Sequence, residues 1–294
     1  PKMGYRRLGK TGMMISEVSL GGHGAVGPER VANRVAVLEK AVELGMNYVD
    51  NNIDKECDLY GEAMSKSKTA GRDKWFIGFA SWPQKITTEY EDNLTADGMM
   101  KSIEDRLKSY HTDMLDMWRP VGATWGEGQK NIPTLLMVNH KALDMVVGVF
   151  EKARQQGKVR YLGVSAHNPK VFRRVLNEYP QFSVIIFPYL FLTQEFGGDS
   201  LLKLAQEKNV GVIAMKTLRG GRLNDMRPYE GAGATFAQAA LRWTLSSPDV
   251  DALVVTMKSP EMVDEYLGAS GWSGEQRQDA ALLTRYARRT QATQ

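Results

Sequence analysis

Short apolar runs alternate with longer amphipathic segments from one end of the chain to the other. The runs are rich in Val and Ile and are continuous rather than alternating, which is typical of strands that are buried on both faces. This pattern predicts eight strands, at about residues 15–20, 47–50, 75–80, 114–118, 160–165, 184–189, 210–216 and 252–256.

The segments between the runs have the periodicity of amphipathic helices. In the first of them Val31, Val35, Leu38 and Val42 fall on one helical face, and Gly45 ends the helix. Further helices are expected near residues 58, 103, 150, 172, 204 and 240. Strands that are each followed by a helix predict an α/β fold of the (β/α)8 TIM barrel type.

Two segments fall outside this repeat. Residues 121–138 are expected to form a long loop on the catalytic face of the barrel, and residues 274–290 are expected to form an extra C-terminal helix. No linker or low-complexity stretch divides the chain, so we expect one domain over residues 1–294.

The composition narrows the class of protein. Apolar residues make up 43% and charged residues 24% of the chain, which is ordinary for a globular protein and excludes collagen, coiled coil and long disorder. The one cysteine, Cys57, cannot form an internal disulfide or a thiolate metal cluster. The net charge of +4 is too small to indicate a nucleic-acid partner, and no apolar run approaches the roughly 20 residues of a membrane helix.

The expected location is the cytoplasm. The pair Arg6 and Arg7 is followed by Leu8 and Gly9, not by the apolar segment of an export signal. A leader removed ahead of Pro1 stays an open alternative, and so does assembly into a homo-oligomer.

Four candidate catalytic side chains fall at or just after predicted strand ends, where the chemistry of such barrels takes place: Asp50, Lys55, Arg119 and His167. A carboxylate can orient a catalytic group, and a desolvated lysine or a histidine can transfer a proton. A guanidinium suits a carboxylate or a phosphate. Structural roles stay open for each of them, but an ion pair between Arg119 and Asp116 is not expected, because strand side chains alternate between faces. We expect no metal site, because no third ligand accompanies the histidines.

Two segments after the last two predicted strands predict an anion site. They combine basic residues, glycines and a helix start: Lys216, Leu218, Arg219 and Gly220 in one, and Lys258 and Ser259 in the other. Glycines allow a ligand to approach the backbone, and the free N–H groups of a helix start attract anions. The alternative is two surface turns with incidental basic residues.

Six segments of the sequence together resemble the aldo-keto reductase family in their residues, their order and their spacing. They are residues 5–12, 18–22, 45–50, 157–165, 213–216 and 239–243. The resemblance extends over nearly the whole chain and includes the N-terminal β-hairpin of that family. The resemblance implies an NADPH-dependent reductase of small aldehydes or ketones, in which a tyrosine supplies the proton with help from a lysine, an aspartate and a histidine. It also implies that Ser165 and Asn168 reach the carboxamide of the nicotinamide, that Tyr189 is a further cofactor contact, and that the basic segments hold the phosphates.

The catalytic set of that family is largely replaced in this chain. Only the aspartate is plainly kept, as Asp50. Lys55 stands where the tyrosine should follow, and Ala80 or Ser81 stands in place of the lysine. The position of the histidine falls near Val121. A lysine in place of the phenol has to be tuned by burial instead of by a neighbouring ammonium.

Three functions follow from this pattern. The first is an atypical NADP(H) oxidoreductase for a small carbonyl or polyol substrate, in which Lys55 and Asp50 replace the usual acid. The second is a lyase, isomerase or hydrolase that uses the same polar cluster without a hydride. The third is a catalytically silent barrel that binds nucleotide or a protein partner, which an intact pyrophosphate site beside an empty proton-donor site would indicate. Ile186 stands in place of a glutamine that the resemblance leads us to expect on the nicotinamide side.

Overall fold

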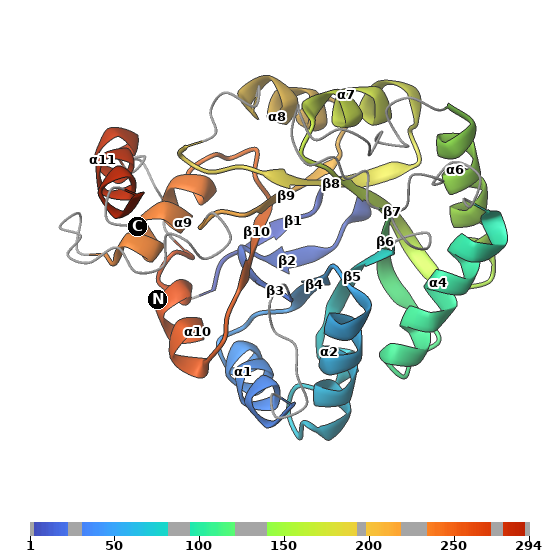
Figure 1. Ribbon diagram of the computed structural model, residues 1–294, viewed down its shortest axis with the longest axis horizontal. Coiled ribbons are helices and arrows are strands. Elements are labelled where there is room, and N and C mark those ends of the chain that lie inside the picture. The colour runs from blue at the N-terminus through green and yellow to red at the C-terminus, as the bar shows by residue number, and fades with distance from the viewer. Residues whose placement is uncertain are drawn as a thin grey trace.

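A closed barrel of parallel strands lies at the centre of the structure (Figure 1). The structure is a computed structural model that describes residues 3–22, 31–81, 95–120, 140–192, 198–218, 234–271 and 279–291. The barrel strands are β3 (Val18–Gly21), β4 (Tyr48–Asn51), β5 (Phe76–Ser81), β6 (Leu115–Pro120), β7 (Val159–Ser165), β8 (Phe182–Pro188), β9 (Gly211–Met215) and β10 (Ala252–Thr256). Each strand pairs in parallel with the next one along the chain, and β10 closes the barrel on β3. The predicted (β/α)8 fold is confirmed.

Helices surround this barrel, as Figure 1 shows. They are α1 (Val31–Glu43), α2 (Asp54–Lys66), α4 (Ala96–Ser109), α6 (His140–Gln155), α7 (Pro169–Glu178), α8 (Gly198–Glu207), α9 (Phe236–Leu245), α10 (Pro260–Leu267) and α11 (Ala280–Gln291). Their apolar faces bury against the strands, which is why the amphipathic period was readable in the sequence. The expected C-terminal helix is present as α11, which packs on α9. The expected loop at 121–138 lies outside the described residues.

An antiparallel hairpin closes the amino-terminal end of the barrel. It consists of β1 (Tyr5–Arg7) and β2 (Met14–Ser16), joined through a short 3-10 turn. Leu8, Met13 and Ile15 pack against the inward-facing apolar side chains of the barrel strands, and the burial of this apolar surface holds the hairpin in place. The carboxyl ends of the strands therefore remain as the place for a pocket.

The prediction of one strand over residues 15–20 is wrong, because the chain divides there at Glu17. The Glu17 carboxylate accepts hydrogen bonds from Arg6 Nε at 2.8 Å, from the Ser270 hydroxyl at 3.0 Å and from the backbone N–H of Gly271 at 2.9 Å. The backbone carbonyl of Glu17 accepts from Leu253 at 2.9 Å. These bonds mark the change from hairpin pairing to barrel pairing. The other predicted strands agree with the observed ones to within about two residues at each end.

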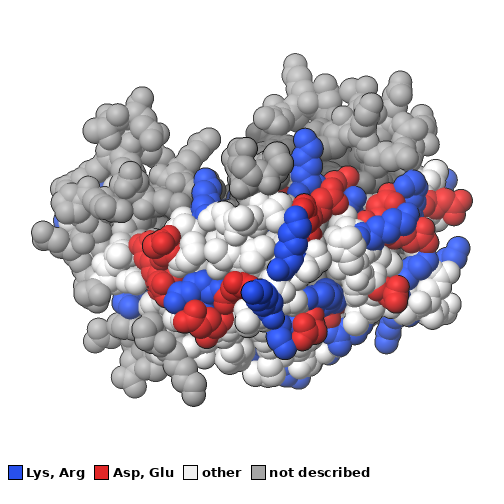
Figure 2. Space-filling model, turned by 90° about the horizontal axis from the view of Figure 1, so that it is seen from below, with Lys and Arg blue, Asp and Glu red and all other residues white. Residues whose placement is uncertain are grey.

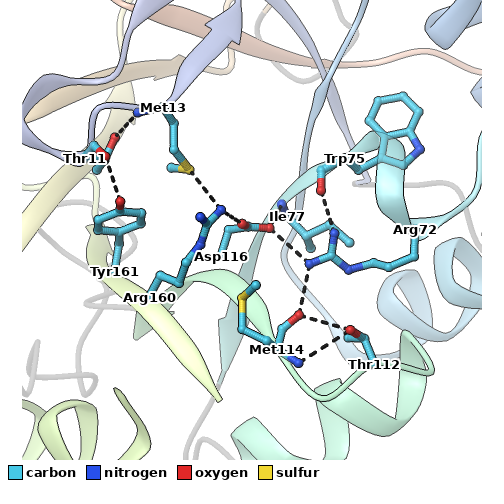
Figure 3. Close-up of polar contacts among 10 residues, drawn as sticks. All are labelled: Thr11, Met13, Arg72, Trp75, Ile77, Thr112, Met114, Asp116, Arg160 and Tyr161. Carbon is cyan, nitrogen blue, oxygen red and sulfur yellow. Dashed lines mark hydrogen bonds and ion pairs between the residues drawn. The ribbon is translucent and has the colours of Figure 1, made fainter. Parts of the chain in front are cut away.

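A buried carboxylate near the amino end of the barrel ties three strands together (Figure 3). Asp116 Oδ2 accepts from the backbone N–H of Ile77 at 2.8 Å and from Arg72 Nη2 at 3.2 Å. Its Oδ1 binds Arg160 Nη2. Because Asp116 is the second residue of β6 and Arg160 the second residue of β7, this cluster lies away from the carboxyl ends of the strands.

The outer surface carries charges of both signs. On the face seen in Figure 2, Lys and Arg side chains are interspersed with Asp and Glu rather than gathered into a large patch of one sign. None of the described helices combines the length and the apolar character that crossing a bilayer requires.

Candidate active site

Asp50 and Arg119 form a buried ion pair toward the carboxyl end of the barrel. Asp50 is the third residue of β4 and Arg119 the fifth residue of β6, and each side chain is only 4% exposed. Arg119 Nη2 binds Asp50 Oδ1, and Arg119 Nε lies 3.4 Å from Asp50 Oδ2. This two-point contact uses the planar fork of the guanidinium. The partner of Arg119 is therefore Asp50, whereas Asp116 is bound by other arginines.

Two neighbouring hydroxyl groups and an amide extend this pair. Tyr48 donates its hydroxyl to Asp50 Oδ2 at 2.9 Å, and Arg119 Nη1 donates to Ser165 Oγ at 2.5 Å. Asn52 Oδ1 lies 3.5 Å from the same Nη1. We call these five residues the polar floor. Burial, reinforced by the charge of Asp50, raises the pKa of Tyr48 well above its usual range, so this group stays a neutral phenol.

Tyr48 is a site residue that the sequence analysis missed. It precedes Asp50 by two positions on β4, so both side chains point to the same face of the strand. That alternation is the signal that could have found it. Its hydroxyl and the guanidinium together engage both oxygens of the Asp50 carboxylate.

Lys55 lies outside the polar floor. It is the second residue of α2, and its side chain is exposed. The phenols near this helix are buried instead: Tyr60 donates to the carbonyl of Gly21 at 3.1 Å, and Tyr110 binds Asn51. Burial raises the pKa of both phenols. Unlike these two phenols, Lys55 is therefore in contact with water.

His167 and Lys216 follow the carboxyl ends of β7 and β9. Burial lowers the pKa of His167 to about 4, helped by the positive charge of Lys216, so the imidazole is neutral at pH 7. Lys216 is exposed in part, and desolvation of the covered part lowers its pKa. The backbone of Lys216 is in the left-handed region, with φ +56°, which is uncommon for a residue with a side chain. Such conformations concentrate at functional sites.

The four residues expected near the nicotinamide differ in their contacts and in how far they are buried. Asn168 caps α7, and its side-chain oxygen accepts from the backbone N–H of Lys170 at 2.9 Å. The ring of Tyr189 is buried against Trp243, with 5.3 Å between ring centroids. Ile186 is buried among the inward-facing apolar side chains of the barrel. Ser165 belongs to the polar floor.

The segments expected to bind an anion follow β9 and β10. Lys258 is exposed, and Ser259 is the N-cap residue of α10. The Ser259 hydroxyl bonds to Glu261, which lowers the pKa of that carboxyl. Leu218 is buried. The other two expected residues, Arg219 and Gly220, lie outside the described residues.

No cluster suited to a metal is found in the part of the chain that the structure describes: no three His, Cys, Asp or Glu side chains come together there. The polar floor therefore consists of hydrogen-bonding groups and one ion pair.

Comparison with known proteins places the chain in a family. The family model described as "Aldo/keto reductase family" matches residues 18–231. L-galactose dehydrogenase of Arabidopsis thaliana is 25% identical, and the match covers 91% of this chain and 88% of that protein. L-glyceraldehyde 3-phosphate reductase of Escherichia coli is 23% identical over the same shares of the two chains.

Solved structures show the same architecture. An aldo/keto reductase from Klebsiella pneumoniae, in complex with NADP and acetate, superimposes with a TM-score of 0.73 at 20% identity. The match covers 96% of this chain and 95% of that one. At this level of identity the likeness shows the barrel fold.

Proposed function

Because the chain belongs to the aldo/keto reductase family, we propose that it is an oxidoreductase that uses NADP(H) to reduce a small carbonyl compound, or to oxidise the matching alcohol. The observation that carries this proposal is the polar floor: a charged, hydrogen-bonded cluster lies at the carboxyl end of the barrel, where such folds hold their substrates. The NADP in the Klebsiella structure supports it, and so do the names of two relatives, a dehydrogenase of L-galactose and a reductase of L-glyceraldehyde 3-phosphate.

The residues after β9 and β10 fit the phosphates of a dinucleotide. Lys216 and Lys258 are exposed cations that follow neighbouring strands, and α10 begins two residues after Lys258. The backbone of Lys216 is left-handed, which costs conformational energy for a residue with a side chain. Conformations of this kind are found most often at functional sites. On the nicotinamide side, Ser165 offers a hydroxyl, whereas Ile186 offers only an apolar surface. When bound, NADPH supplies a hydride to the carbonyl carbon of the substrate.

The protein's part in the reaction is to supply a proton to the carbonyl oxygen. Both oxygens of Asp50 are engaged by Arg119 and Tyr48, so we assign the proton to the ammonium of Lys55. Lys55 is exposed, so the bound cofactor and substrate have to cover it to supply the burial that a lysine acid needs. The lowered pKa of His167, about 4, makes its imidazole a weak base at pH 7, so its role in the site is that of a neutral hydrogen-bonding group. The hydrogen bonds and the ion pair of the polar floor hold the side chains beneath the bound substrate in fixed positions.

Titration with NADPH, followed by intrinsic tryptophan fluorescence, tests the first half of this function. A saturable response at micromolar NADPH is expected, and its absence would refute dinucleotide use. Turnover of a panel of aldehydes and ketones tests the second half. Lys55→Met should lower kcat by at least about 100-fold, the contribution typical of a positioned proton donor, and leave the affinity for NADPH unchanged. Lys66→Met, at an exposed position of the same helix, is the matched control.

A catalytically silent nucleotide-binding barrel is the second candidate function. It is favoured by the burial of Tyr60 and Tyr110, which leaves neither phenol of this region at the surface. Saturable NADPH binding without turnover of any carbonyl in the panel, and with the same result in the Lys55→Met variant, would establish this alternative.

A further inference from the structure

The pairing of β10 with β3 ends at Thr256, and side chains of α1 hold the chain beyond it. The next carbonyl, that of Met257, accepts a hydrogen bond from Arg34 Nη1 at 3.0 Å. The carbonyl of Lys258 accepts one from Asn33 Nδ2 at 2.7 Å. Asn33 and Arg34 are consecutive residues in the first turn of α1, which lies beside α10 in Figure 1. In the described part of the chain, α1 therefore fixes the backbone at the point where strand pairing has ended.

These two bonds fix the backbone on both sides of Lys258. A peptide group is planar, so a hydrogen bond to the Met257 carbonyl also orients the N–H of Lys258, which lies 3.4 Å from Met262 Sδ. The bond from Asn33 orients the peptide group that follows. With both peptide planes held, the direction of the Cα–Cβ bond of Lys258 is set. Its side chain is exposed, so the backbone decides the direction in which the ammonium projects.

Arg34 is itself held in place by the barrel. Only 2% of the residue is exposed, and its guanidinium carbon lies 4.8 Å from the centre of the Tyr60 ring. The Tyr60 hydroxyl donates to the carbonyl of Gly21 at 3.1 Å, so its oxygen accepts from Arg34 Nη1 at 3.0 Å. Gly21 is the barrel partner of Thr256. Arg34 therefore connects the end of the β3–β10 pairing to the carbonyl of Met257.

We propose that Asn33 and Arg34 are positioning residues that aim the ammonium of Lys258 at the anionic group of the bound ligand. This inference rests on the function proposed above, in which that group is a phosphate of the dinucleotide. Neither residue is assigned a contact with the ligand, since both act through the backbone of Lys258. Asn33 carries no charge, yet its removal should weaken the part of the binding that comes from charge attraction. That consequence separates positioning from a general effect on stability.

The variant Asn33→Ala tests this role, because Asn33 is exposed, whereas replacement of the buried Arg34 would also disturb packing. The Kd of NADPH is measured by fluorescence titration at about 0.05 M and about 0.5 M NaCl. At the lower salt concentration, Lys258→Met should raise the Kd about tenfold and Asn33→Ala about three- to fivefold. At the higher concentration both effects should shrink, because salt screens the attraction between the ammonium and the anion. Asn177→Ala, at an exposed position of α7, is the matched control and should leave the Kd unchanged.

A double-mutant cycle decides whether Asn33 acts through Lys258. In the Lys258→Met background, Asn33→Ala should change the Kd by less than about twofold, because the ammonium that it aims is absent. An equal loss in both backgrounds, or a loss in Asn33→Ala that salt does not reduce, would show a merely structural role and overturn the proposal. If the unaltered protein binds no NADPH, the proposed function fails and this inference fails with it. Binding by the unaltered protein, with an unchanged Kd in either single variant, refutes the inference alone.

Discussion

The ion pair between Asp50 and Arg119 makes a sharp prediction about stability. Arg119→Met keeps much of the side-chain length but removes the positive charge. The Asp50 carboxylate, 4% exposed, then keeps only the Tyr48 hydroxyl at 2.9 Å among the polar-floor donors described above. Removing one partner of a buried pair costs about 3–5 kcal/mol, because the remaining charge is left without compensation. That loss is a fifth or more of the roughly 5–15 kcal/mol by which proteins are stable.

A double variant that combines Arg119→Met with Asp50→Asn separates the effect of the uncompensated charge from the loss of packing. Asp50→Asn removes the remaining charge, and its amide oxygen can still accept a hydrogen bond from the Tyr48 hydroxyl. The double variant should therefore recover about 2 kcal/mol relative to Arg119→Met alone. The free energy of unfolding is measured by urea denaturation at pH 7. Lys66→Met, which breaks an exposed pair with Glu62, is the control and should cost at most about 0.5 kcal/mol. A double variant less stable than Arg119→Met would refute the reasoning.

Three further predictions concern pH and the hairpin. The pKa of His167 is lowered from 6.5 to about 4, so as the pH falls the unfolded chain takes up this proton before the folded protein does. The free energy of unfolding should therefore fall by about 2 kcal/mol between about pH 7 and pH 4, and urea titrations of His167→Asn should show a smaller fall. Burial raises the pKa of Asp251 from 3.8 to about 6, so stability is lost as the pH rises from about 4 to 6, which is opposite to the effect of His167. Asp251→Asn can still accept a hydrogen bond from the backbone of Val212, so it should stabilise the protein at pH 7 by about 1–2 kcal/mol. Arg6 donates to the carbonyls of three residues beyond its own hairpin, so Arg6→Lys should cost about 1–3 kcal/mol and lower the Tm.

Each of these has an outcome that contradicts it. A slope between pH 4 and 7 that survives unchanged in His167→Asn would show that its imidazole is not the group that titrates. Destabilisation of Asp251→Asn at pH 7 would mean that the charged carboxylate stabilises the fold, and full stability of Arg6→Lys would mean that one ammonium replaces the whole set of bonds.

The barrel was predictable because its strands and helices are encoded locally. Val- and Ile-rich runs of strand length and helical periodicity both depend on near neighbours in the chain. The division at Glu17 was not, because the break depends on Ser270, Gly271 and Leu253, which lie far along the chain.

The candidate site was predictable to the level of strand ends but not of partners. Asp50 and Arg119 were both expected at the carboxyl ends of strands, and the structure brings them together across 69 positions of sequence. Pairing of this kind depends on which strands lie close together in the barrel, here β4 and β6 on either side of β5, and no local pattern contains that. Lys55 and His167 were expected at the same end, and the structure places the first in solvent and buries much of the second.

The register of the barrel explains how Asp50 keeps a cationic partner. The family resemblance places a lysine at Ala80 or Ser81, on β5, where this chain has no cation. Arg119 is the direct neighbour of Ala80 in the pairing of β5 with β6. A longer side chain from the adjacent strand can therefore reach the same carboxylate, and the small Ala80 leaves room beside it. Because an unpaired Asp50 would be costly in this buried position, the cation can change strand, but it cannot be lost while the aspartate remains.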